Sequence, residues 1–94
     1  MIITTVKLFP RKEHKQNFLN AFQEVSAIVY KEEGCIEYEI YQKDAAASDL
    51  FIFERWESQL ALDRHLKTKH MSDFFAKTAK WFEKENEMQT YQIK

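Results

Sequence analysis

The stretch Leu50–His70, LFIFERWESQLALDRHLKTKH, decides the fold, because an alternating strand in it runs directly into a short helix. Side chains alternate across a strand, so one face carries every second residue: Leu50, Ile52, Glu54 and Trp56. Ser58 has the side chain of a helix N-cap. In the helix that follows, Leu62, His65 and Leu66 point to one side. The stretch therefore predicts a histidine in an apolar helix stripe, beside a strand that carries an inward glutamate and tryptophan.

Composition limits the class of protein. The 94 residues, 45% of them hydrophobic, predict a single domain over residues 1–94. Fourteen basic and fifteen acidic side chains give a net charge of -1, which argues against a nucleic-acid partner. Cys35 is the single cysteine, so an internal disulfide or a cysteine metal cluster is excluded. Because no apolar run approaches the roughly 20 residues of a membrane helix, we expect a cytoplasmic protein without a membrane partner.

The rest of the chain alternates between strand and helix patterns. Residues 2–9 predict a strand that ends at Pro10, and residues 12–33 predict a long helix that ends at Gly34. Further on we expect a strand, a loop, the strand and helix of Leu50–His70, another helix and a weak last strand: 35–42, 43–49, 50–70, 72–84 and 88–93. This order, β-α-β-β-α-β, predicts an α+β ferredoxin-like fold with an antiparallel sheet.

The predicted strands carry large apolar side chains on both faces. The face opposite Ile52 and Trp56 bears Phe51 and Phe53, and Tyr41 lies on the same side of the preceding strand. Helices can cover only one face of such a sheet. An exposed patch of this size is typical of an interaction surface, so the sequence predicts a homodimer whose sheets face each other.

Four short segments resemble the antibiotic biosynthesis monooxygenase domain family: Gly34–Tyr38 (GCIEY), Phe53–Ser58 (FERWES), Ala61–His65 (ALDRH) and Thr68–Met71 (TKHM). The resemblance covers essentially the whole chain. It implies a dimeric ferredoxin-like α+β barrel and the oxidation of a small aromatic quinol or phenol by dioxygen, with no cofactor. That chemistry is physically reasonable, because a deprotonated quinol can itself reduce dioxygen if the protein supplies a base, a dry pocket and hydrogen-bond donors.

Other activities within the resemblance stay open. Relatives that cleave haem use an asparagine on the first strand, and residues 2–9 contain none, which argues against haem degradation here. Another branch isomerises a phosphorylated hydroxyketone signal molecule, and the His-x-x-Thr-x-His pattern of residues 65–70 is compatible with it. A dimeric ligand-binding domain without chemistry is the third alternative.

The site residues follow from the resemblance together with the inward faces. His65 is the expected base, because its ordinary pKa near 6.5 suits proton transfer around neutrality. Glu54 is expected to orient His65, although a buried ion pair with an arginine is an alternative reading. The expected substrate-binding residues are Tyr38, Ile40, Trp56 and His70, with a surface position as the alternative for His70. Because His70 follows His65 by five positions rather than four, we expect no metal site from this pair.

Overall fold

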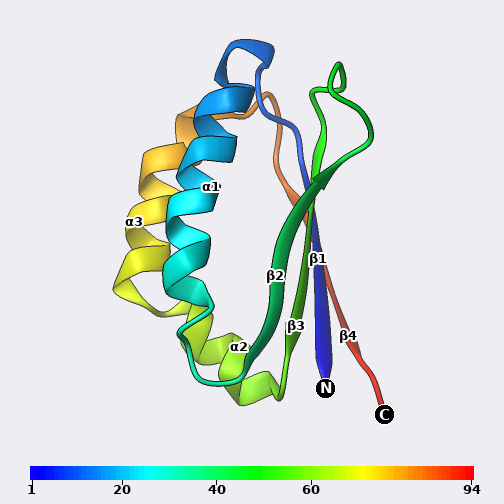
Figure 1. Cartoon of the computed structure of the whole chain (residues 1–94), viewed down its shortest axis with the longest axis vertical. Helices are drawn as coiled ribbons and strands as arrows, with labels where there is room; N and C mark the ends of the chain where they lie inside the picture. The colour runs from blue at the N-terminus through cyan, green and yellow to red at the C-terminus, as the bar shows by residue number, and fades with distance from the viewer.

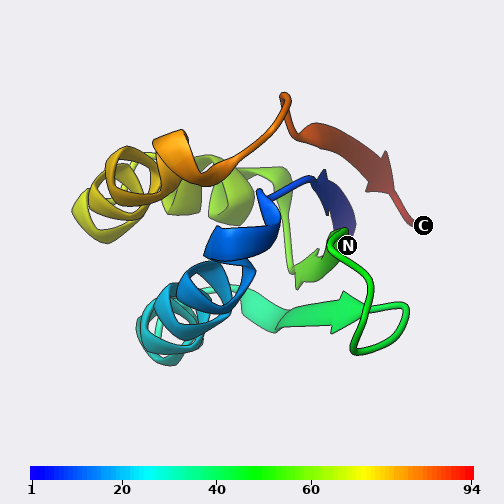
Figure 2. The same ribbon diagram turned by 90° about the horizontal axis from the view of Figure 1, so that it is seen from above.

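One four-stranded antiparallel sheet carries all three α-helices on the same face (Figures 1 and 2). The computed structural model describes residues 1–94. Its elements are β1 (Ile2–Leu8), α1 (Lys15–Val29), β2 (Cys35–Gln42), β3 (Leu50–Trp56), α2 (Gln59–Leu66), α3 (Lys69–Thr78) and β4 (Glu87–Gln92). Two 3₁₀ turns, Lys12–His14 and Ala79–Trp81, precede α1 and follow α3. No helix has both the length and the apolar content needed to cross a membrane.

The strand order β2-β3-β1-β4 confirms the predicted ferredoxin-like fold. β3 pairs antiparallel with both β1 and β2, which places Glu54 directly between Thr4 and Tyr38. A residue in this position lies in the middle of the sheet, on the face covered by the helices. The sheet therefore holds the Glu54 carboxyl at the centre of the molecule, where it is 5% exposed.

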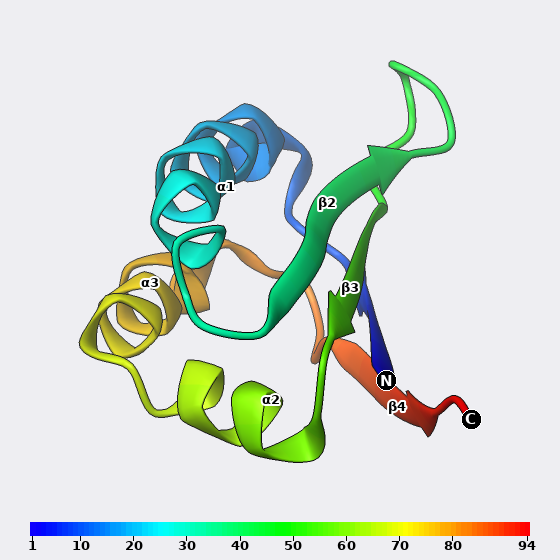
Figure 3. The ribbon, with the colours of Figure 1, turned by 60° about the horizontal axis from the view of Figure 1, so that its bottom comes forward.

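Two hydroxyl caps define the helices that follow β3. Ser58 is the predicted N-cap of α2, and its side chain accepts a hydrogen bond of 3.2 Å from the backbone N–H of Ala61. Thr68 does the same for α3 by accepting from the N–H of Met71. Because of this second cap, α3 begins at Lys69, three residues before the start expected for the helix over 72–84. Figure 3 shows the chain turning between the two helices.

A bulge at the start of β2 changes which side chains face the core. Cys35 pairs with Trp56, but Glu37 pairs with Arg55, so Ile36 is the extra residue of the strand. Ile36 is 41% exposed, whereas Tyr38 is buried. The simple alternation expected for residues 35–42 therefore holds only from Glu37 onward.

Gly34 lets the chain enter β2 close to α2. Its φ is +86°, a conformation that residues with a Cβ adopt at a cost of about 1–2 kcal/mol. A Cβ built on Gly34 would lie 2.5 Å from the Cβ of Ala61, which adds an overpacking cost of about 1–3 kcal/mol. We expect Gly34→Ala to lower the free energy of unfolding by roughly 2–5 kcal/mol, measured by urea denaturation.

A double-mutant cycle separates the two costs. In an Ala61→Gly background the clash disappears, so Gly34→Ala should then cost only the backbone part, about 1–2 kcal/mol. An equal cost in both backgrounds would show that the close approach of Gly34 and Ala61 carries no energy.

Candidate active site

His65 is fixed by a carboxylate that comes from another part of the chain. Its side chain is 1% exposed on α2, and its Nδ1 lies 3.0 Å from Oε2 of Glu32, in the turn after α1. A carboxylate can only accept a hydrogen bond, so the proton of the neutral imidazole resides on Nδ1. Nε2 is thereby left with a free lone pair, which is the state required of a general base.

Glu54 lies on the other side of the same imidazole. The indole N–H of Trp56 donates to Glu54 Oε1 at 2.9 Å, because the two residues share one face of β3. The distance from Glu54 Oε1 to His65 Nε2 is 3.9 Å, beyond a hydrogen bond. In this structure Glu54 is therefore not hydrogen-bonded to His65: the hydrogen bond that orients the imidazole is made with Glu32, and no arginine is paired with Glu54.

Burial shifts the pKa values of Glu54 and His65 in opposite directions. Burial raises the pKa of Glu54 to about 7, and the nearby charge of Glu32 adds to this, while the hydrogen bond from Trp56 opposes it. Burial also lowers the pKa of His65, against the hydrogen bond from Glu32. Around neutral pH the imidazole is uncharged and Glu54 exchanges its proton. The pair therefore offers one proton acceptor and one proton donor side by side.

Tyr38 completes the polar part of the site. Its ring stacks on Phe22 at 4.9 Å between centroids and meets the His65 ring edge-on at 5.6 Å. Burial raises the pKa of the Tyr38 hydroxyl, so this group stays neutral and can donate a hydrogen bond.

A small cavity opens between the sheet and helices α2 and α3. Its volume is about 150 Å³, and Tyr38, Glu54 and His65 all line it. Most of the wall is apolar and is contributed by helices and strands from the whole chain: Val6, Leu8, Phe18, Ile52, Leu66, Met71, Phe74, Phe75, Phe82 and Met88. An apolar cavity of about this volume can accept a single aromatic ring. The site thus combines a dry, ring-sized space with an acid and a base.

Three of the six predicted site residues lie away from the cavity wall. Trp56 is fully buried behind His65, with 4.5 Å between the ring centroids, and supports the site from outside. Ile40 is partly buried against the core but does not line the cavity. His70 is in the first turn of α3, where its Nε2 turns toward Glu32 at 2.7 Å and not toward the cavity. The placement of Trp56, Ile40 and His70 on the wall of the pocket is thus corrected.

Sequence reasoning missed Glu32. It lies in the charged run Lys31–Glu33, which looks like an ordinary solvated turn. Its carboxylate reaches His65 only because the turn after α1 lies against α2, and no local pattern signals that contact. The same holds for Thr4, which is opposite Glu54 on β1 and has a buried hydroxyl without a hydrogen-bond partner.

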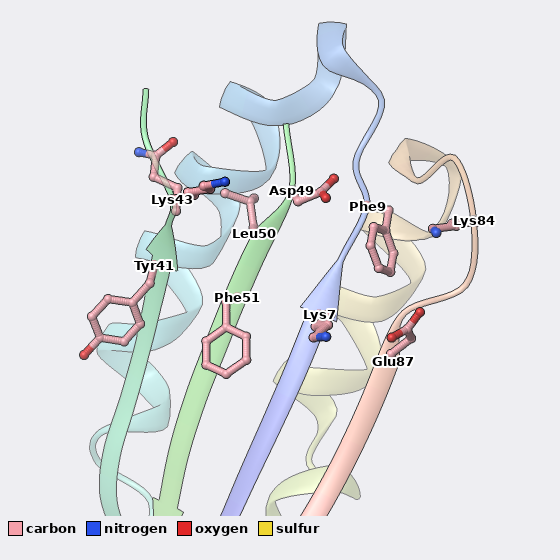
Figure 4. A pocket seen from close by; sticks show the side chains of 10 residues that line it. Lys7, Phe9, Tyr41, Lys43, Asp49, Leu50, Phe51, Lys84 and Glu87 are labelled. Carbon is pink, nitrogen blue, oxygen red and sulfur yellow. The ribbon is translucent and has the colours of Figure 1, made fainter. Parts of the chain in front are cut away.

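A larger hollow of about 600 Å³ lies on the face of the sheet turned away from the helices (Figure 4). Phe9, Tyr41 and Phe51 contribute aromatic rings to it, and charged side chains surround them: Lys7, Lys43, Asp49, Lys84 and Glu87. No histidine lines it. The acid–base pair belongs to the smaller cavity, which is therefore the candidate active site.

Comparison with known proteins agrees with the fold. The family model described as "Antibiotic biosynthesis monooxygenase" matches residues 1–77. The chain is 30% identical over 81 residues to the protein named "Probable quinol monooxygenase YgiN" from Escherichia coli K12, with 78% of each chain covered. It is 26% identical over 77 residues to "Putative monooxygenase YcnE" from Bacillus subtilis, covering 82% of this chain and 81% of that protein.

Solved structures show the same architecture. A conserved protein from Methanosarcina mazei Go1 superimposes with a TM-score of 0.93 and 30% identity, and the match covers 99% of this chain and 92% of the other. The match to the family model spans β1 to α3 and includes the two residues of the acid–base pair, His65 and Glu54. The chain therefore belongs to the antibiotic biosynthesis monooxygenase family.

Proposed function

We propose that this protein is a monooxygenase that oxidises a small, single-ring quinol or phenol with dioxygen, without a bound cofactor. The observation that carries the proposal is the buried His65, whose Nδ1 is hydrogen-bonded to Glu32 and which lines an apolar cavity together with Glu54, a carboxyl group whose pKa burial raises to about 7. Family membership and the printed names of the relatives support the same type of reaction.

His65 would start the reaction by breaking the O–H bond of the substrate. Its Nε2 takes the proton, and the imidazolium that forms is stabilised by the Glu32 carboxylate on Nδ1. The substrate is left as a phenolate in a cavity with an apolar wall, where it is a stronger electron donor than the phenol. Tyr38 is placed to donate a hydrogen bond to the phenolate oxygen.

The phenolate then reacts with dioxygen, and the atoms and electrons balance without a further reactant. The phenolate passes one electron to dioxygen, and the resulting phenoxyl radical and superoxide combine to form a carbon–oxygen bond. The peroxide takes back the proton held on His65. Its O–O bond breaks as the C–H bond of the oxygenated carbon breaks, so one oxygen atom stays in a quinone product and the other leaves as water. Glu54 lies 3.9 Å from His65 Nε2 and lines the cavity, so it is placed to accept the carbon-bound proton and to protonate the departing hydroxide.

Oxygen uptake tests this proposal. In chelator-treated buffer, monocyclic hydroquinones should be consumed faster than by autoxidation, with one dioxygen per quinol and one ¹⁸O atom from ¹⁸O₂ in the product. Naphthohydroquinones should react more slowly, since a cavity of about 150 Å³ is close to the size of one ring. Absence of uptake with every quinol would contradict the proposal.

The isomerase alternative uses the same acid–base pair. A base and a protonatable carboxyl 3.9 Å apart could also move a proton between two carbons of a hydroxyketone. Exchange of solvent deuterium into a phosphorylated hydroxyketone, in the absence of oxygen uptake with quinols, would favour that reaction.

We also propose that the open face of the sheet is a homodimer interface. Phe51 and Phe53 are only partly buried there, and Tyr41 and Tyr91 are 51% and 47% exposed in the single chain. Light scattering should give the mass of two chains for the wild type. Phe53→Glu should shift it to one chain, because a charge would be buried in the interface.

Leu60→Glu is the matched control for the dimer. Leu60 is 57% exposed on α2, away from the open face of the sheet, so this variant should keep the mass of two chains. A monomeric wild type, or a dimer unaffected by Phe53→Glu, would contradict the proposed interface.

A further inference from the structure

His70 does not line the cavity, yet it shares a carboxylate with the proposed base. Oε2 of Glu32 lies 3.0 Å from His65 Nδ1 and 2.7 Å from His70 Nε2. One carboxylate therefore accepts hydrogen bonds from two imidazoles. The side chains of His65, Glu32 and His70 are 1%, 13% and 23% exposed, so the series runs from the buried site to the surface.

Thr68 holds the two histidines in a fixed relation. Its hydroxyl donates to the backbone carbonyl of His65 at 2.8 Å and lies 3.3 Å from His70 Nε2. The same hydroxyl caps α3, whose first turn carries His70. The two imidazoles are thus connected by the Glu32 carboxylate and by the backbone between α2 and α3.

Sharing one carboxylate couples the charges of the two rings. A positive charge on His70 is compensated by Glu32, which leaves less of the carboxylate's charge to support a positive His65, and the two rings also repel each other. Consistently, a charge on His70 acts to lower the pKa of His65, after burial and against the influence of Glu32. The other titratable groups that face His65 are Glu54 on β3 and Tyr38 on β2. Around His70, a hollow also carries Glu24 of α1 and Asp73 and Lys77 of α3.

We propose that His70 is a positioning residue for the base: while neutral it holds Glu32 on His65, and when protonated from solvent it keeps His65 unprotonated. This inference rests on the proposed function for its catalytic meaning. Its consequence is that the site keeps a working base at lower pH than a buried histidine paired with an undivided carboxylate would.

Two conservative variants should move the titration of His65 in opposite directions. His70→Gln keeps an N–H donor for Glu32 but removes the titrating charge. The pH midpoint of the His65 titration, followed by NMR, should therefore rise. Glu32→Gln keeps an oxygen that accepts from Nδ1 but removes the negative charge, so the midpoint should fall. His14→Gln is the matched control, because His14 stacks on Trp81 outside this network and should leave His65 unchanged.

Activity should follow the same signs. In the pH profile of kcat/KM for a monocyclic quinol, the acid limb should move to higher pH in His70→Gln and to lower pH in Glu32→Gln. At a pH below the limb, each pH unit of this movement changes kcat/KM tenfold. A purely structural role would lower the plateau without moving the limb.

The outcomes separate this inference from the proposed function, since the NMR titration needs no substrate. Opposite shifts of the His65 midpoint support the coupling even if no quinol is oxidised. A His70→Gln midpoint equal to that of His14→Gln, or shifts in the same direction in both variants, would overturn it.

Discussion

A His65→Ala variant is expected to lose a factor of about 10²–10⁴ in kcat for quinol oxidation, the range typical of removing a general base. His65 is the only imidazole that lines the cavity, and its Nε2 is the atom that we propose takes the substrate proton. The measurement is initial oxygen uptake at pH 7.5, corrected for autoxidation.

Two further variants protect this prediction from a folding artefact. His65→Gln keeps most of the side-chain volume and a polar group for Glu32 but cannot act as a base, so it should lose activity to a similar extent. His14→Ala removes a histidine that lies outside the site and should keep full activity. Full activity in a folded His65→Gln protein would contradict His65 as the base.

Replacing Glu54 by Gln is expected to stabilise the protein at alkaline pH by roughly 3–4 kcal/mol. Burial raises the pKa of Glu54 from 4.5 to about 7. At about 1.4 kcal/mol for each pKa unit, ionising this buried group opposes folding by that amount. Gln carries no charge, and its oxygen can still accept the hydrogen bond that Trp56 donates.

The sign of the pH dependence follows from the raised pKa. The folded state holds a proton on Glu54 between about pH 4.5 and pH 7, where the unfolded state has lost it, so wild-type stability falls as pH rises through this range. The variant lacks this contribution. Urea unfolding should therefore show the two proteins converging near pH 4 and the variant ahead at pH 8, whereas exposed Glu24→Gln should match the wild type at both pH values. A difference independent of pH would contradict a raised Glu54 pKa.

The fold could be predicted from the sequence because its signals are local. Alternation in residues 50–56, the cap at Ser58 and the glycine at position 34 each act within a few residues, and each lies where the pattern placed it. The inward directions of His65 and Glu54 follow from the same periodicity, and both residues line the cavity.

The rest of the site depends on contacts between distant segments. Glu32 reaches His65 only because the turn after α1 folds against α2, across 33 residues of sequence. The carboxylate oxygen of Glu54 nearest to His65, Oε1, already accepts a hydrogen bond from Trp56. The periodicity of the sequence does not reveal that Trp56 and His65 compete for this oxygen. The Thr68 cap starts α3 at Lys69, and His70 in its first turn contacts Glu32 instead of lining the pocket. The sequence has no strong signature for this cap.

Because Glu32 rather than Glu54 is hydrogen-bonded to His65, the two carboxyl groups can have different roles. The Glu32 side chain is 13% exposed and contacts His65 Nδ1, so it is placed to stabilise an imidazolium, whereas burial raises the pKa of Glu54 to about 7, so this group can carry a proton. Two carboxylates thus serve the histidine in different ways, because one is close to water and the other is not.

The proposed function requires that the cavity binds a single-ring phenol and that His65 takes its proton. The most direct measurement is the absorption spectrum of a nitrophenol bound without oxygen, at a pH where the free nitrophenol is protonated. We expect the phenolate spectrum when the wild type is saturated and the phenol spectrum with His65→Gln. A ligand bound to the wild type in the protonated form would contradict it.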